Sequence, residues 1–404
     1  MPDEHIHLKS RKYLKTLCEE IPDRSVGGEG NRQATAFFRN ELKMLEWETE
    51  TPEFDAMDWV NGGASLTVND KSFKVFVSPY APGCFVTGEL VCATTPDELE
   101  KTDVQDKILF LHGDIAKEQL MPKNFVFYNP EEHQRIVGLL EKSDAKAIIS
   151  ATKRNSALAG GVYPFPLIED GDFNVPSVYM TEEEGQKLLP SVGQSVSLVS
   201  KSERIPGKAY NVIGRKGSKK TERIVVTAHI DAKKGTPGAI DNATGVTVLL
   251  LLAELLRDYE GKYGIELVAF NGEDYYAVPG QMNYIATNQG NFDSILLNIN
   301  IDGAGYKEGP SAFSFFNLPD DIYQKANDII RCNHHIVEGP QWPQGDHSIF
   351  VQFGRPAIAV SSKWFLDHME DQDITHTPKD RLEITDPVKV VNIAQALATL
   401  IQAY

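Results

Sequence analysis

The second half of the chain contains several short, strongly apolar segments that run directly into acidic residues, histidine or glycine. RIVVTAHID, IELVAFNGED and ILLNINIDGAG are rich in Ile, Leu and Val without strict alternation, which is typical of strands buried on both faces of a parallel sheet. A helix-length apolar stretch, Gly245 to Arg257, lies between the first two. This alternation predicts an α/β fold, and ligands bind just past the carboxyl ends of such strands.

Length and local changes in pattern predict two domains. At 404 residues with 41% hydrophobic content, the chain is long enough for one large core and a smaller one. Helical spacing predicts helices over residues 5–20 and 31–45, and Asp386 followed by Pro387 predicts the cap and first turn of a closing helix. Short strands and turns predominate from about residue 84 to 200. We therefore expect a smaller β-rich domain over residues 84–200, inserted between residues 1–83 and 201–404, which form the main domain.

Charge and hydropathy exclude several classes of partner. The chain has 40 basic and 57 acidic residues and a net charge of -17, which disfavours binding to a phosphate backbone. No segment reaches the ~20 apolar residues that a membrane span requires. The start, MPDEHIHLKSRKYLK, lacks the apolar run of a signal peptide. We expect a cytoplasmic protein that binds neither nucleic acid nor membrane.

Histidine and carboxylate side chains recur at the ends of the apolar segments and in the turns that follow them. The metal-site candidates are His229, Asp241, Glu273, Asp274, Asp302 and His376. Adjacent carboxylates such as Glu273 and Asp274 repel each other unless a cation or a proton neutralises one of them, and Asp302, after a mostly apolar run, is costly to bury without a partner. One carboxylate can bind a metal while its neighbour takes a proton from water. The set therefore predicts a two-metal hydrolase.

Each candidate also has a purely structural interpretation. A single histidine near a strand end is more often structural than a ligand, and Asp241, in a Gly-rich turn, could cap the helix that follows. Asp231 lies two residues after His229, so in an extended chain both side chains point to the same face, and the carboxylate can hold the imidazole tautomer of a metal ligand. The sequence contains no HExxH, GxSxG, Walker or GxGxxG motif, which removes most other enzyme classes.

Motifs in a fixed order resemble those of the M28 family of zinc exopeptidases, of the aminopeptidase type. They are AHIDAKKGTPGAIDNATG, AFNGEDYYAVPGQ, NINIDGAG, GDHSIF and HTPKD, and the resemblance is strong over residues 210–404. It implies a three-layer αβα sandwich around a mixed, mostly parallel sheet. Residues from about 84 to 199 resemble the protease-associated domain that many of these enzymes carry.

Carried over motif by motif, the resemblance implies two zinc ions per chain. His229 and Asp302 would hold one ion, Asp274 and His376 would hold the other, and Asp241 would bridge both.

The resemblance also implies roles for residues that bind no metal. Glu273 would be the general base and Asp231 would orient His229. Asp346 and His347, which occupy the place of a family Ser-Asp-His motif, would support the site from outside the ligand set.

The chain departs from the family pattern in two places. The family usually has Glu where this chain has Asp274, and the loop from His229 to Asp241 is shorter than in typical members. The family also usually has a cis peptide bond after the bridging acid, which would be Asp241–Asn242 here.

The leading prediction is a dinuclear zinc aminopeptidase that removes N-terminal residues from peptides by metal-activated water. A glutaminyl cyclase-like acyltransferase with a single zinc ion is an alternative, as is a carboxypeptidase or dipeptidase on the same fold. A binding protein on a degenerate peptidase scaffold is a further alternative, which the filled ligand positions disfavour. Residue preference, peptide length, native metal and oligomeric state do not follow from the sequence.

Overall fold

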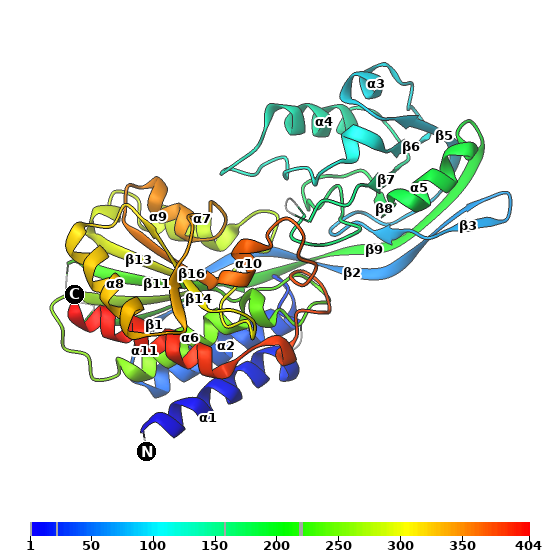
Figure 1. The fold of residues 1–404 in the computed structure, drawn as a ribbon. Coiled ribbons are helices and arrows are strands. Elements are labelled where there is room, and N and C mark those ends of the chain that lie inside the picture. Colours follow the sequence, from blue (N-terminus) through cyan, green and yellow to red (C-terminus); the bar gives the residue numbers. More distant parts are fainter. Residues whose placement is uncertain (1, 22, 157–158, 218–220) are drawn as a thin grey trace. The chain divides into compact units, whose positions relative to one another are not determined.

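The computed structural model describes residues 2–21, 23–156, 159–217 and 221–404, and the chain divides into two compact units (Figure 1). The larger unit comprises Met1–Ala56, Lys208–Met369 and Ile374–Tyr404, and the smaller one Met57–Gly207 and Glu370–Asp373. The described residues form two eight-stranded sheets. None of the described helices combines the length and the apolar character that crossing a bilayer requires.

A mixed sheet forms the centre of the larger unit, with strand order β1-β10-β12-β11-β13-β16-β14-β15. These strands are β1 (Glu48–Glu50), β10 (Val212–Lys216), β11 (Arg223–His229), β12 (Gly264–Phe270), β13 (Ile295–Ile301), β14 (Ser311–Phe316), β15 (Ile336–Glu338) and β16 (Ala357–Ser362). The central strands β12, β11, β13 and β16 run parallel, whereas β10 and β14 each pair antiparallel with their inner neighbour. The predicted apolar segments are therefore the central parallel strands.

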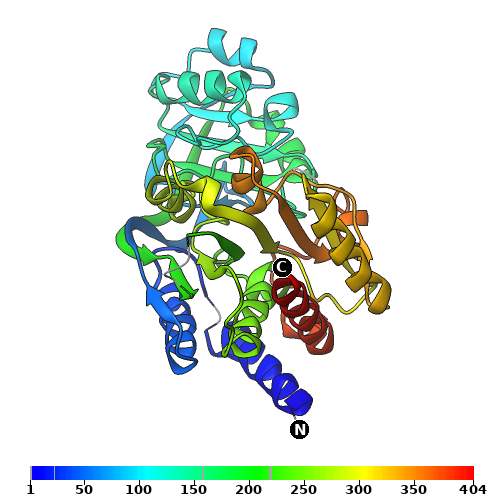
Figure 2. The same cartoon turned by 90° about the vertical axis from the view of Figure 1, so that its left-hand side faces the viewer.

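Helices cover both faces of this sheet (Figure 1). They are α1 (Pro2–Lys15), α2 (Glu29–Met44), α6 (Thr244–Leu255), α7 (Pro279–Thr287), α8 (Asp320–Cys332), α9 (His347–Gln352), α10 (Lys363–Asp367) and α11 (Pro387–Ala403). Helices α1, α2, α6 and α11 lie on one face of the sheet and share a single apolar core with it, whereas α7 and α9 lie on the other face. Figure 2 shows α11, in red, beside α6, in green. This arrangement confirms the predicted three-layer αβα sandwich.

The two helices that flank the candidate site follow directly from their sequences. Every residue of α6 from Thr244 to Ala253 is buried, as its apolar run predicts. The closing helix begins as predicted: Asp386 accepts a hydrogen bond from the Val388 N–H at 2.9 Å, and Pro387 occupies the first turn.

The smaller unit has its own sheet, with strand order β3-β2-β9-β5-β6-β7-β8-β4. Its elements are β2 (Glu53–Val68), β3 (Lys71–Phe73), β4 (Phe76–Val77), β5 (Cys84–Ala93), α3 (Pro96–Lys101), β6 (Ile108–Leu111), α4 (Glu131–Glu141), β7 (Ala147–Thr152), β8 (Ser177–Thr181), α5 (Glu182–Leu188) and β9 (Ser195–Tyr210). Strands β5, β6, β7 and β8 are parallel. Two separate apolar clusters include side chains of these strands.

The borders of this unit, at Met57 and Gly207, lie outside the predicted limits of 84 and 200. The difference comes from β2 and β9, which are neighbours in the smaller unit's sheet. Strand β9 also pairs antiparallel with β5, from Cys84 opposite Ser200 to Glu89 opposite Ser195. The protease-associated identity of this unit stays a prediction.

Candidate metal centre

The candidate ligands come from the carboxyl ends of three neighbouring parallel strands and from two loops. His229 is the last residue of β11, Asp274 follows β12, and Asp302 follows β13. Because β12, β11 and β13 are adjacent and parallel, their carboxyl ends meet at one edge of the sheet. Asp241 lies in the irregular turn Ala239–Ala243 just before α6, and His376 lies in the loop before α11.

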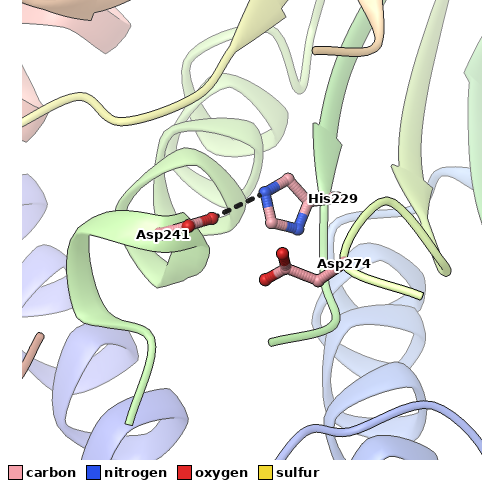
Figure 3. Close-up of side chains that lie close together, drawn as sticks. All are labelled: His229, Asp241 and Asp274. Atoms are coloured by element: carbon pink, nitrogen blue, oxygen red, sulfur yellow. Dashed lines mark ion pairs between the residues drawn. The ribbon is translucent and has the colours of Figure 1, made fainter. Parts of the chain in front are cut away.

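The structure brings these side chains within a few ångströms of one another. His229 Nε2 lies 3.0 Å from Asp241 Oδ1 and 3.5 Å from Asp302 Oδ1. His376 Nε2 lies 3.1 Å from Asp241 Oδ2 and 2.9 Å from Asp274 Oδ1. Figure 3 shows His229, Asp241 and Asp274 converging, and one ligand atom from each lies within 4.8 Å of the others. The predicted arrangement, with Asp241 between two histidines, is present in the geometry.

Two buried atoms at this site have no hydrogen-bond partner among the described residues. They are His229 Nε2 and Asp274 Oδ2. Asp241 is near enough to His229 for a hydrogen bond, but the two groups are not aligned for one. A buried polar atom without a hydrogen-bond partner is costly, and a cation bound between these atoms would remove that cost. The residues present therefore fit divalent metal ions with imidazole and carboxylate ligands.

The close grouping of carboxylates and histidines shifts the pKa of both histidines and of Asp241. Burial lowers the pKa of His229 and of His376, but the neighbouring Asp302 and Asp274 carboxylates raise it by more, so both pKa values lie well above the ordinary value. Burial raises the pKa of Asp241, but the close approach of both histidines outweighs this, so its pKa lies below its usual range. In the protein without ions, protons on the histidines balance charge that cations would otherwise balance.

Glu273, the predicted general base, lies beside this group and is partly exposed. Burial raises its pKa well above the usual range, and although His229 opposes the shift, the charges of Asp302 and Asp274 add to it. The carboxyl therefore holds a proton to higher pH than an ordinary glutamate does.

Asp231 makes contacts through both its side chain and its main chain. Its carboxylate accepts hydrogen bonds from the backbone N–H groups of Gly272 at 2.8 Å, Glu273 at 3.3 Å and Asp274 at 3.0 Å. Its backbone carbonyl, rather than its carboxylate, is the atom within hydrogen-bond distance of His229 Nδ1, at 3.2 Å against 3.7 Å. The main chain of Asp231 is therefore placed to orient His229, while its side chain holds the loop that carries Glu273 and Asp274.

Asp346 and His347 lie outside the ligand group, in agreement with the prediction. Asp346 accepts a hydrogen bond from Gln281 at 2.8 Å, and burial raises its pKa to about 7. Burial lowers the pKa of His347 to about 4, and its Nε2 lies 3.0 Å from the Trp342 carbonyl. The predicted cis peptide bond at Asp241–Asn242 is present. Asn242 supplies the helix cap, because its Oδ1 accepts from the Gly245 N–H at 3.1 Å.

Several residues that brace the site were not singled out from the sequence. Asp380, at the end of the HTPKD segment, is completely buried and accepts hydrogen bonds from Ile240 and Asp241. Arg24, also completely buried, donates to the carbonyls of Ile230, Pro237 and Gly238. The presence of an acid in the same short segment as the candidate ligand His376 is a usable sequence signal for Asp380, whereas nothing in the sequence around Arg24 points to this loop.

Residues 211–401 match the family model described as peptidase family M28. This part of the chain belongs to peptidase family M28. Among curated relatives of this M28 peptidase, the aminopeptidase YwaD of Bacillus subtilis (strain 168) is 21% identical over 389 residues, which cover 92% of this chain and 80% of that protein.

Solved structures share the fold of this M28 peptidase. An aminopeptidase from Aneurinibacillus sp. strain AM-1 is similar with a TM-score of 0.75 at 20% identity, over 98% of this chain and 93% of that one. A zinc aminopeptidase from Bacillus subtilis is similar with a TM-score of 0.74 at 17% identity, over 98% and 94% of the two chains. At these identities the likeness establishes the zinc-exopeptidase type of fold.

Proposed function

We propose that this M28 peptidase is a two-zinc aminopeptidase that removes N-terminal residues from peptides. The observation that carries the proposal is the position of Asp241, whose two carboxylate oxygens lie 3.0 Å and 3.1 Å from the Nε2 atoms of His229 and His376, respectively. A carboxylate placed in this way can bridge two cations, each with a histidine of its own. The relatives' names support both the metal and the peptide end that is attacked.

The remaining ligands divide between the two proposed ions. Asp302 lies beside His229, and Asp274 lies beside His376. Each ion would therefore have one imidazole, one carboxylate of its own and one oxygen of Asp241, which leaves room for water and substrate, as in catalytic zinc sites.

The chemistry of hydrolysis follows from this arrangement. When bound, the zinc ions polarise the scissile carbonyl and lower the pKa of a water molecule from ~15.7 toward ~7. Glu273 accepts the proton from that water and returns it to the leaving amine. Asp231 keeps Glu273 in place through the backbone N–H groups of its loop.

A substrate panel tests the proposal. Aminoacyl anilides, N-acetylated anilides and carboxyl-blocked peptides are assayed with and without a chelator. We expect cleavage of the free-amino substrates alone, loss of activity with chelator and recovery with zinc. Cleavage from the carboxyl end, or of dipeptides only, contradicts the aminopeptidase assignment. Ring closure of N-terminal Gln by a protein with one zinc ion favours the cyclase alternative.

The variant E273Q tests the assigned base. We expect a loss in kcat of about 10²–10⁴-fold with unchanged zinc content, because only proton transfer is removed. E260Q, at an exposed glutamate of the same unit, is the matched control and should behave as the wild type. Near-normal kcat in E273Q contradicts the role of Glu273.

A further inference from the structure

A buried carboxylate, Asp380, connects the loop of one proposed histidine ligand to the turn of the bridging ligand. Asp380 follows His376 in the segment HTPKD and is completely buried. Its Oδ1 accepts from the Ile240 N–H at 2.7 Å and its Oδ2 from the Asp241 N–H at 3.0 Å. Both oxygens are therefore used on consecutive backbone amides, and the second amide belongs to the residue whose side chain lies between the two imidazoles.

Asp231 makes the same kind of contact on the other side of the site. It lies just after His229, and its carboxylate accepts from the backbone amides of Gly272, Glu273 and Asp274. Each proposed histidine ligand is thus followed, within a few residues, by a buried aspartate that holds the main chain of a carboxylate ligand. The same hydrogen-bond arrangement therefore occurs twice, once at the main chain of Asp274 and once at the main chain of Asp241.

Further contacts close the turn of Asp241 against the loop of His376. The Thr236 hydroxyl donates to the Thr377 carbonyl at 2.9 Å and accepts from the Gly238 N–H at 3.1 Å. The Ala239 N–H donates to the Asp380 carbonyl at 3.3 Å.

The turn is also tight, as Gly238 shows. It has a φ of 57°, and a Cβ there would lie 2.6 Å from the Asp241 carbonyl oxygen. Only glycine adopts this conformation at no steric cost. The backbone of the turn therefore has one defined conformation, which the hydrogen bonds of Asp380 can hold.

We propose that Asp380 is a positioning residue that sets the spacing between the bridging carboxylate of Asp241 and the imidazole of His376. The inference rests on the proposed metal site for its effect on zinc, but its effect on the backbone does not. A carboxylate is required because it offers acceptors to both N–H groups, whereas the amide of asparagine has one acceptor oxygen and an amino group that would face an N–H donor. Loss of this contact would free the main chain of Asp241. It would also weaken binding of whichever of the two proposed zinc ions has the lower affinity.

Hydrogen exchange of the chelator-treated protein directly tests the contact between the Asp380 carboxylate and the backbone amides of Ile240 and Asp241. In D380N, we expect the backbone amides over residues 239–242 to exchange at least tenfold faster, with protection in α6 retained. D231N serves as the reciprocal variant, with faster exchange over residues 272–274 instead. Asp170 in the smaller unit is the matched control, because it is also a buried carboxylate that accepts from two backbone amides, those of Lys123 at 2.8 Å and Asp172 at 2.7 Å.

Zinc titration of the same variants measures the effect of this contact on zinc affinity. We expect D380N to weaken the second of two zinc ions at least tenfold and D170N to leave both unchanged. D380E, which keeps the carboxylate, should recover part of the affinity. If D380N does not fold, T236V supplies the test, because it removes the Thr236 contacts at nearly constant volume and should shift exchange and zinc affinity in the same direction.

Wild-type exchange and wild-type zinc affinity in D380N, or in T236V where D380N does not fold, overturn the proposal. A wild-type protein that binds no zinc contradicts the proposed function instead, and the exchange measurement still decides the role of Asp380.

Discussion

Asp274 Oδ1 lies 2.9 Å from His376 Nε2, although the M28 pattern has the longer glutamate at position 274. Asp231 accounts for this approach, because its carboxylate accepts from the Asp274 N–H at 3.0 Å and so fixes the main chain close to the site. The shorter side chain therefore reaches His376 without a further methylene group. The second proposed metal position is complete in this chain despite the substitution.

D274N tests whether this contact forms a metal site. The variant keeps the size of the side chain but removes its charge, and a neutral amide is a poorer zinc ligand than a carboxylate. Zinc content after dialysis, measured by atomic emission, should fall from two ions per chain to about one. D258N, at an exposed position of the same unit, should keep two. Two tightly held ions in D274N would contradict the assignment.

Asp346 gives the metal-free protein a defined pH dependence. Burial raises its pKa to about 7 from an ordinary value of 3.8, with His229 and Gln281 opposing the shift. A carboxyl group whose pKa is raised by folding contributes fully to stability when the pH is below its pKa in the unfolded state. This contribution is lost as the pH rises through its pKa in the folded state. The free energy of unfolding should therefore fall between pH 5 and pH 7, by up to about 1.4 kcal/mol per pH unit for this group.

The variant D346N isolates that contribution. Because its amide does not titrate in this range, the decline from pH 5 to pH 7 should be shallower than in the wild type. Urea denaturation of chelator-treated protein at three pH values measures it. Parallel curves for the two proteins would show that Asp346 does not titrate as described.

Arg24 should be essential for the stability of the loop between His229 and Asp241. It is completely buried, and its guanidinium donates to the carbonyls of Leu17 at 2.6 Å, Ile230 at 3.0 Å, Pro237 at 2.7 Å and Gly238 at 2.7 Å. R24M removes these donors and leaves the carbonyls buried without partners, so we expect a loss of ~3 kcal/mol or more in the free energy of unfolding. R331M, at an arginine whose side chain is 75% exposed, should change it by less than ~0.5 kcal/mol. Equal stability of R24M and the wild type would refute this role.

The ligands at strand ends were predictable from the sequence for a physical reason. His229, Asp274 and Asp302 each follow an apolar segment, and apolar segments of this kind become adjacent parallel strands whose carboxyl ends coincide. Asp241 and His376 lie in loops, where no periodic pattern applies. Their inclusion rested on their order in the chain relative to the strand-end acids, and their ligand roles rested on the resemblance to the M28 family.

Apart from Asp380, the residues that brace the site were not predictable, because their contacts join distant parts of the chain. Arg24 lies 206 residues from Ile230, to which it donates. Asn31 and Asn271 exchange hydrogen bonds of 2.8 Å and 2.9 Å across 240 residues. The pairing of β2 with β9 is likewise a long-range contact. Local patterns predict elements, whereas such pairings depend on tertiary packing.

Anomalous diffraction at the zinc edge, from crystals of the zinc-loaded protein, is the most direct measurement of the central claim. The account predicts two peaks about 3.5–4 Å apart, the usual separation in two-metal sites, on either side of the Asp241 carboxylate. One peak should lie next to His229 and Asp302 and the other next to Asp274 and His376. A single peak, or peaks away from Asp241, would contradict the account.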